Sequence, residues 1–341
     1  MISQLDPASV TAALRDVLDV SLSDAGLKTA IPRLAKNPKK LAQIEHLVGR
    51  LYSRHRLLQG DARRLEFIPS GSIALVVTSP PYWTLKEYVG SNGQLGDVSN
   101  YEEFITEIAR VWTQCHRVLQ PGGRLVIVVG DVCLSRREHG RHSVVPLHAS
   151  ISERCRTIGF ENLATLIWHK ISNARFEVEG TGAGFLGKPY EPNAVIKNDI
   201  EFILMLRKSG GYRKVLPVNR LLSVIGERDH REWFQQIWHL TGASTRDHPA
   251  PYPLELAERL IRMFSFCGDT VLDPFVGTGT TMLAAAKWGR HSIGVDIEPS
   301  YVRFAQRRLA REFATFVSAS ELVVENVADL PEGTKERSVT A

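Results

Sequence analysis

Short apolar runs alternate with amphipathic segments along most of the chain. Residues 73–78 form a continuous apolar run, and the strand predicted at 124–129 is apolar from Leu125 onward, which is typical of strands buried on both faces of a sheet. Further short strands are predicted at 57–60, 164–168, 202–206, 270–272 and 292–295. Helices are predicted at 102–119, 146–158, 254–266, 280–288 and 299–313, where apolar residues recur at helical spacing. This alternation predicts an α/β fold with a doubly wound, largely parallel sheet.

The two ends of the chain and one internal stretch depart from this alternation. Helices are expected at 8–20 and 39–56, with Pro32 and Pro38 breaking the stretch between them. Residues 171–245 are irregular and rich in Gly, Asn and aromatic side chains. The 341-residue length fits about two domains, or one large domain with an insertion.

Composition excludes several classes of protein. The chain is 43% hydrophobic and 23% charged, so it can bury a core. No apolar run approaches the ~18 residues of a membrane span, and the N-terminus lacks the features of a secretory signal. The four cysteines are scattered without zinc-type spacing, so we expect reduced thiols, no metal site and a cytoplasmic protein.

Positive charge is concentrated near the N-terminus, although the net charge is only +5. Residues 28–56 hold eight Lys or Arg against Glu45 alone. Such a block is either a solvated helix face or a contact for nucleic-acid phosphates. Lys36, Lys39 and Lys40 are the candidates for that contact.

A glycine-rich turn is the first candidate site. A short strand leads into Asp273-Pro-Phe275-Val-Gly277-Thr-Gly279-Thr280-Thr, and a helix follows. Small residues there let a ligand approach the backbone, and Asp296, at the end of the next strand, can accept both ribose hydroxyls of a nucleoside. No phosphate-binding motif is present, which favours S-adenosylmethionine. The alternative is a tight turn with a helix-capping Asp.

A proline-rich turn is the second candidate site. Ser79-Pro80-Pro81-Tyr82 follows a buried strand, and the prolines remove two backbone donors. The turn therefore offers acceptors, the Ser79 hydroxyl and the Pro80 carbonyl, beside the flat ring of Tyr82. This combination suits the exocyclic amino group of a stacked base. The alternative is a rigid loop with a packed tyrosine.

Together these motifs resemble the amino-group DNA methyltransferases. The proline turn precedes the glycine turn by about 190 residues, which is the order of the β group of that family. The resemblance implies a circularly permuted, Rossmann-like sheet that binds S-adenosylmethionine. Asp61 and the segment His248-Pro249 resemble further elements that contact this cofactor. The implied cofactor residues are Asp61, His248, Pro249, Asp273, Phe275, Gly277, Gly279, Thr280 and Asp296, and the implied catalytic residues are Ser79, Pro80, Pro81 and Tyr82.

The resemblance also implies a division of the chain. The expected units are a basic helical extension at 1–56, a catalytic half at 57–170, a target-recognition region at 171–245, a cofactor-binding half at 246–314 and a loosely ordered acidic tail at 315–341. Duplex DNA is the expected partner, and a cognate restriction endonuclease is a candidate partner. Besides the three lysines, the candidate DNA contacts are Trp83, Arg175, Lys188 and Arg213.

The expected reaction is site-specific methylation of an extruded base. No cysteine follows a proline, so direct attack by the amine is expected rather than a covalent intermediate. Ser-Pro-Pro-Tyr resembles the cytosine-N4 enzymes, because most adenine-N6 relatives carry Asp at the serine position. The alternatives are an adenine-N6 enzyme, a glutamine-amide protein methyltransferase, or a catalytically dead module that binds S-adenosylmethionine or DNA.

Overall fold

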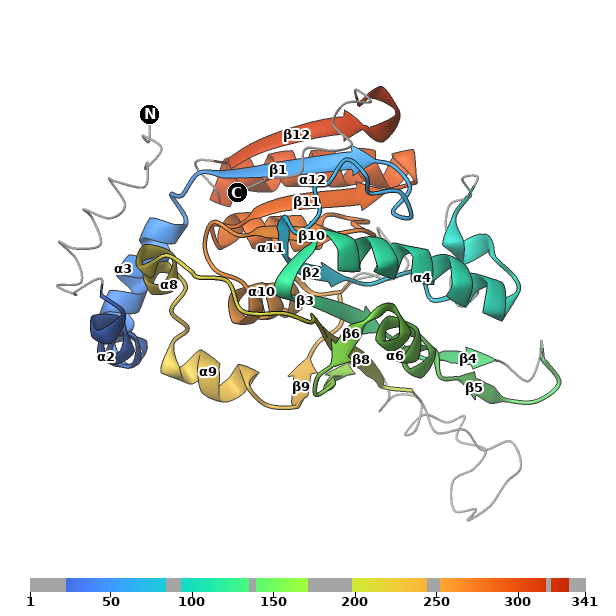
Figure 1. The fold of residues 1–341 in the computed structure, drawn as a ribbon, viewed down its shortest axis with the longest axis horizontal. Helices are drawn as coiled ribbons and strands as arrows, with labels where there is room; N and C mark the ends of the chain where they lie inside the picture. The colour runs from blue at the N-terminus through green and yellow to red at the C-terminus, as the bar shows by residue number, and fades with distance from the viewer. Residues whose placement is uncertain are drawn as a thin grey trace, which may run out of the picture.

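The central feature of the protein is one twisted sheet of ten described strands (Figure 1). The computed structural model describes residues 23–83, 93–134, 139–170, 198–243, 252–316 and 320–330. The strand order is β12-β1-β11-β10-β2-β3-β8-β7-β9, and β6 pairs with β8. The strands are β1 Ser53–Gln59, β2 Ile73–Thr78, β3 Leu119–Val129, β6 Phe160–Asn162, β7 Leu166–Lys170, β8 Ile200–Lys208, β9 Ile237–Leu240, β10 Thr270–Asp273, β11 His291–Asp296 and β12 Ser320–Asn326. A separate hairpin joins β4 Val132–Leu134 to β5 Ser143–Val145.

Six neighbouring strands, from β12 to β3, run parallel, and β8 joins β3 in the antiparallel direction. The strand that carries the proline turn, β2, lies beside the strand that carries the glycine turn, β10. Both strands end at the same edge of the sheet, because they are parallel. The predicted doubly wound α/β sheet is therefore confirmed, and its topology brings the two motifs together.

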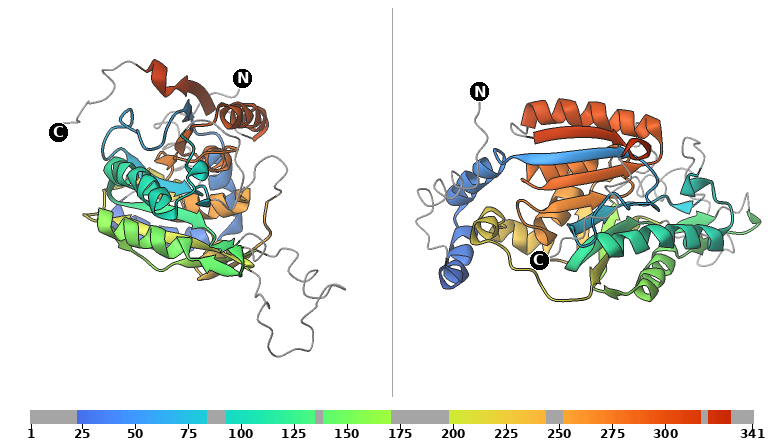
Figure 2. Two further views of the ribbon diagram at one scale, coloured as in Figure 1. Left: turned by 90° about the vertical axis from the view of Figure 1, so that its right-hand side faces the viewer. Right: turned by 45° about the horizontal axis from the view of Figure 1, so that its top comes forward.

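Helices cover both faces of this sheet, as Figure 2 shows. On one face lie α4 Tyr101–Val118 and α6 Leu147–Ile158, and on the other α10 Leu254–Phe264, α11 Thr280–Lys287 and α12 Pro299–Phe316. Alternate residues of β2 divide between the faces: Val76 packs in the core under α4, while Leu75 and Val77 pack in the core under α10. This two-sided burial explains the continuous apolar runs. No helix among the described residues is long and apolar enough to cross a membrane.

The described part of the N-terminal extension before β1 contains two helices, whose bounds differ from the prediction. The structure has α2 Asp24–Ala35 and α3 Pro38–Val48, which pack with α8 Pro217–Leu222. Pro32 lies inside α2 rather than breaking it, because the buried faces of Leu27 and Leu34 anchor that helix. The helix predicted at 39–56 ends at Val48, and β1 begins earlier than the predicted 57. The predicted helix 8–20 lies outside the described residues.

The tail predicted to be loosely ordered contains a strand instead. β12 pairs with β1 in parallel along its whole length, from Ser53↔Ser320 to Gln59↔Asn326. Cross-strand ion pairs explain why the acidic segment joins the sheet next to β1. In one of them, Arg56 Nε lies 2.7 Å from a carboxylate oxygen of Glu325. Residues 331–341 lie outside the described part.

The expected insertion at 171–245 is in large part a continuation of the main sheet. The strand predicted at 202–206 is the middle of β8, which extends the sheet next to β3, and β9 pairs with β7. α9 Glu227–Trp233 connects α8 to β9. The apolar strand Ile200–Lys208 is buried between neighbours, so it cannot belong to a separate polar insertion. Residues 171–197 lie outside the described part.

Candidate functional site

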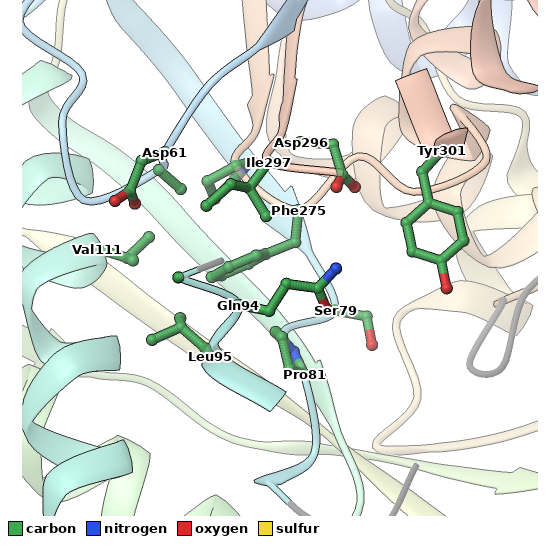
Figure 3. A pocket seen from close by; sticks show the side chains of 13 residues that line it. Asp61, Ser79, Pro81, Gln94, Leu95, Val111, Phe275, Asp296, Ile297 and Tyr301 are labelled. Carbon is green, nitrogen blue, oxygen red and sulfur yellow. The ribbon is translucent and has the colours of Figure 1, made fainter. Parts of the chain in front are cut away.

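A pocket lies at the carboxyl edge of the sheet, where β2 and β10 end side by side (Figure 3). The winding of the sheet changes direction between these two strands, which is where open α/β sheets bind ligands. The pocket is lined by Asp61, Ala62, Ser79, Pro81, Gly93, Gln94, Leu95, Val111, Pro274, Phe275, Asp296, Ile297 and Tyr301. Figure 3 shows the Phe275 ring between Asp61 and Asp296. The topology thus brings two residues of the proline turn, Ser79 and Pro81, into one pocket with Asp296, at the strand end predicted to bind ribose.

Asp296 ends β11 and faces this pocket. Its two carboxylate oxygens accept backbone N–H groups from Gly277, at 3.0 Å, and Glu298, at 2.9 Å. Burial raises the pKa of Asp296 from 3.8 to about 6, although these hydrogen bonds oppose the shift. Each oxygen keeps a second lone pair, so the carboxylate can also accept hydroxyls from a ligand.

Asp273 does not line the pocket, in contrast to its predicted cofactor contact. It is 1% exposed and accepts Thr78 Oγ1 at 2.7 Å, Thr281 Oγ1 at 2.5 Å and the backbone N–H of Phe275 at 3.1 Å. Burial raises its pKa above the usual value. The side chain therefore fixes the glycine turn to β2 from beneath, because its oxygens are occupied by the strand end and the turn itself.

The glycines of the turn shape its backbone. Gly277 and Gly279 have φ of +47° and +81°, which side chains with a Cβ rarely adopt. Thr280 is 6% exposed, and its hydroxyl receives a hydrogen bond at 3.0 Å from Arg308 on α12. Arg308 also donates to the Thr278 carbonyl. The predicted cofactor contact of the Thr280 side chain is thus not supported, because that side chain points to α12.

Asp61 lines the opposite side of the pocket, beside an arginine that sequence patterns did not reveal. Both of its oxygens lie 3.0 Å from Arg63 Nε. Arg63 also reaches Glu107 on α4, at 2.6 Å, and the Gly93 carbonyl, at 3.1 Å. This network fixes the loop after β1 against α4, so the Asp61 position is rigid.

The proline turn presents Ser79 and Pro81 to the pocket, while Pro80 and Tyr82 are buried. Ser79 Oγ lies 3.2 Å from the Tyr82 hydroxyl, which lies 3.1 Å from Glu201 Oε2. The Tyr82 ring is 5% exposed and belongs to the core. It therefore differs from the open stacking face expected from the sequence, because its ring packs inward and its hydroxyl is held by Glu201.

Trp83 follows the turn in a strained conformation. Its φ is +46°, the one positive φ of a non-glycine residue among the residues described. The indole N–H donates to the Val98 carbonyl at 2.9 Å, and the ring packs edge-on against Tyr101. These contacts fix the turn to the start of α4, and such strain is typical of functional loops.

Trp83 follows the proline turn beside the pocket, whereas the other predicted DNA contacts that can be located lie far from it. Residues 36–40 precede β1, at the amino edge of the sheet, so one strand length of about 20 Å separates them from the carboxyl edge. Arg213 lies at the same amino edge, where it pairs with Asp269 and lies over the Phe266 ring. The three lysines and Arg213 therefore lie at the edge of the sheet opposite the pocket. His248, Pro249, Arg175 and Lys188 lie outside the described residues.

Several pocket residues were missed by sequence analysis. Gln94, Leu95 and Ile297 carry no motif that would reveal them. Glu201 does not line the pocket but contacts Tyr82, and it had a detectable signal in the sequence, because it is the single acid within the largely apolar strand Ile200–Lys208. Within the described ranges, no cluster of three or more His, Cys, Asp or Glu could hold a metal ion.

Comparison with known proteins gives a consistent result. A family model described as DNA methylase matches residues 73–307. The chain is 36% identical to the type II methyltransferase M.MjaI of Methanocaldococcus jannaschii, over 76% of this chain and 94% of that protein. The crystal structure of TTHA0409, a putative DNA modification methylase of Thermus thermophilus complexed with S-adenosyl-L-methionine, is 49% identical, covers 81% of this chain and 100% of that chain, and gives a TM-score of 0.66. The PvuII cytosine-N4-specific DNA methyltransferase shares the fold, with a TM-score of 0.55 and 19% identity over 82% of this chain and 97% of that one.

Proposed function

Because this chain belongs to the DNA methylase family whose members modify adenine N6 or cytosine N4, we propose that it transfers a methyl group from S-adenosylmethionine to the N4 amino group of cytosine at a specific site in duplex DNA. The observation that carries the proposal is the shared pocket. A hydroxyl able to accept an amine N–H, on Ser79, lines the same pocket as the carboxylate of Asp296.

The residues of the pocket suit an adenosyl ligand. Asp296 supplies a carboxylate at a strand end, and Phe275, Ile297 and Leu95 supply apolar walls. Gly277, with a φ of +47°, adds no side chain of its own to the turn after β10. When bound, S-adenosylmethionine supplies an electrophilic methyl group on a sulfonium. The protein would hold its ribose through Asp296 and its adenine against the apolar walls.

The protein's own contribution to the reaction is to orient the amine. The lone pair of an aromatic amine is delocalised into the ring, which makes it a weak nucleophile. Accepting its N–H groups at the Ser79 hydroxyl and the Pro80 carbonyl localises that pair toward the methyl group. Rigid acceptors in a pocket shielded from water act mainly by positioning and preorganisation. The burial of Pro80 and the fixed position of Trp83 support such rigidity.

The choice of cytosine rests on the serine of Ser-Pro-Pro-Tyr, which resembles the cytosine-N4 enzymes. The test is digestion of DNA from a host that expresses the protein, followed by separation of the nucleosides and mass spectrometry. N4-methylcytosine that depends on Ser79 supports the proposal. N6-methyladenine in its place would refute the choice of base while keeping the reaction type.

The role of Ser79 has its own test. We expect Ser79→Ala to lower the single-turnover rate on cognate duplex by ~10²–10³, as for loss of one preorganised polar contact. Affinity for S-adenosylmethionine should change little, because the pocket's ribose and adenine contacts remain. A near-normal rate would show that the Pro80 carbonyl and positioning suffice.

A further inference from the structure

Three polar groups of described residues lie near the hydroxyl of Tyr82, and the roles of these three follow from counting protons. It lies 3.1 Å from Glu201 Oε2, 3.4 Å from the Val128 carbonyl and 3.2 Å from Ser79 Oγ. Carboxylate and carbonyl oxygens only accept, and a tyrosine has one hydroxyl proton. The proton of Tyr82 therefore points toward Glu201 or Val128, and the nearer and charged acceptor, Glu201, is favoured.

This assignment fixes the hydroxyl of Ser79 as well. When the Tyr82 hydroxyl donates its hydrogen bond to Glu201, the Tyr82 oxygen can only accept a hydrogen bond from Ser79. The Ser79 hydroxyl proton therefore points toward Tyr82. The lone pairs of Ser79 Oγ then face away from Tyr82, on the side where Ser79 lines the pocket. A hydroxyl in that orientation accepts N–H bonds, whereas a freely rotating one also presents its proton.

Glu201 is held in place by a second residue. It lies on β8, is 7% exposed and forms an ion pair with Lys170 on the neighbouring strand β7. The Lys170 ammonium also lies 4.8 Å from the centre of the Trp168 ring. A carboxylate buried at this level needs such a partner, and the pairing fixes the oxygen that faces Tyr82.

We propose that Glu201 is a positioning residue that sets the direction of the Ser79 hydroxyl through Tyr82, so that Ser79 accepts from the target amine. This inference rests on the proposed role of Ser79 in methyl transfer. It holds for either base, since the amino groups of cytosine and adenine both donate N–H bonds. Glu201 itself touches neither substrate nor cofactor in this scheme.

The test is a double-mutant cycle between Glu201 and Ser79, measured as single-turnover methylation. Glu201→Gln keeps the shape but allows an amide N–H to donate to Tyr82, which frees the tyrosine proton to turn toward Ser79. We expect the rate to fall about tenfold in the wild-type background and less than about twofold in a Ser79→Ala background, because coupled residues are not additive. The affinity for S-adenosylmethionine should be unchanged in both.

Two further variants complete the test. Glu161→Gln is the matched control: it removes an ion pair between Glu161 on β6 and Arg207 on β8, at the other end of β8, and should leave the rate unchanged. Tyr82→Phe removes the linking oxygen but keeps the ring. If Glu201→Gln does not fold, Tyr82→Phe replaces it in the double-mutant cycle with Ser79→Ala. It should likewise lose its effect when Ser79 is Ala.

Two results would overturn the inference. One is a Glu201→Gln rate equal to that of the wild type. The other is an equal fall in the presence and absence of Ser79, which would make Glu201 a purely structural residue. The identity of the methylated nucleoside is read from the wild-type enzyme alone, so an error in the proposed base is distinguishable from an error about Glu201.

Discussion

The pKa of Asp296 makes cofactor binding dependent on pH. Burial raises this pKa to about 6, and the ionised form is the one that accepts two ribose hydroxyls. With that pKa, about nine tenths of the carboxyl groups are ionised near pH 7 and about one tenth near pH 5. We therefore expect the affinity for S-adenosylmethionine to fall about tenfold between these two values.

The same group affects stability with the opposite sign. Its pKa is raised in the folded protein, from 3.8 to about 6. The stability contributed by proton uptake is therefore fully present below about 3.8 and is lost as the pH rises through about 6. The full shift corresponds to up to about 3 kcal/mol, at roughly 1.4 kcal/mol for each unit. Asp296→Asn removes this titration, so its stability should lack the pH dependence due to Asp296; it also loses one of the two acceptors for the Gly277 and Glu298 N–H groups, and it should bind the cofactor poorly.

Calorimetric titration with S-adenosylmethionine at the two pH values tests this reasoning, with Asp296→Asn as the matched control. The variant should bind weakly and with little change between the two conditions. Chemical unfolding of both proteins across the same range gives the stability difference. Equal affinity of the wild type near pH 5 and pH 7, or the same pH dependence in the variant, would refute the assigned role.

Three other substitutions test the structure at single points. Gly294→Ala should lower the free energy of unfolding by about 1–3 kcal/mol in chemical denaturation, because its Cβ would lie 2.5 Å from Met282 Sδ; unchanged stability would contradict this packing. Thr78→Val should cost about 1–3 kcal/mol by leaving buried Asp273 short of a 2.7 Å hydrogen bond, and a neutral effect in the same assay would argue against that network. Replacing the lysines of residues 36–40 by Gln should leave the salt dependence of DNA affinity unchanged, since they lie at the amino edge; a slope reduced by about 0.9 for each lost contact would place DNA there after all.

The local patterns of the sequence predicted the parts of the fold that depend on local physics. Runs buried on both faces, such as Ile73–Thr78, are apolar without alternation, and this identified the parallel strands. The positive φ values of Gly277 and Gly279 favour glycine, so the turn could be predicted from the sequence alone. The predictions that were wrong concern elements whose structure depends on long-range contacts. Packing of Leu27 and Leu34 keeps Pro32 inside a helix, and pairing with β1 converts an acidic tail into a strand.

For the candidate site, the sequence by itself identified the chemistry that Ser79 and Asp296 can perform, because a hydroxyl after a buried strand and a carboxylate at a strand end keep these properties in any context. Only the tertiary structure decided which side chains meet. Strand pairing places β2 beside β10, turns Asp273 into a buried anchor and brings Glu201 to Tyr82, 119 residues earlier in the chain. The shared direction of the parallel strands also places residues 36–40 and the pocket at opposite edges of the sheet. Such contacts depend on the order of the strands within the sheet, and the spacing of residues along the chain does not specify that order.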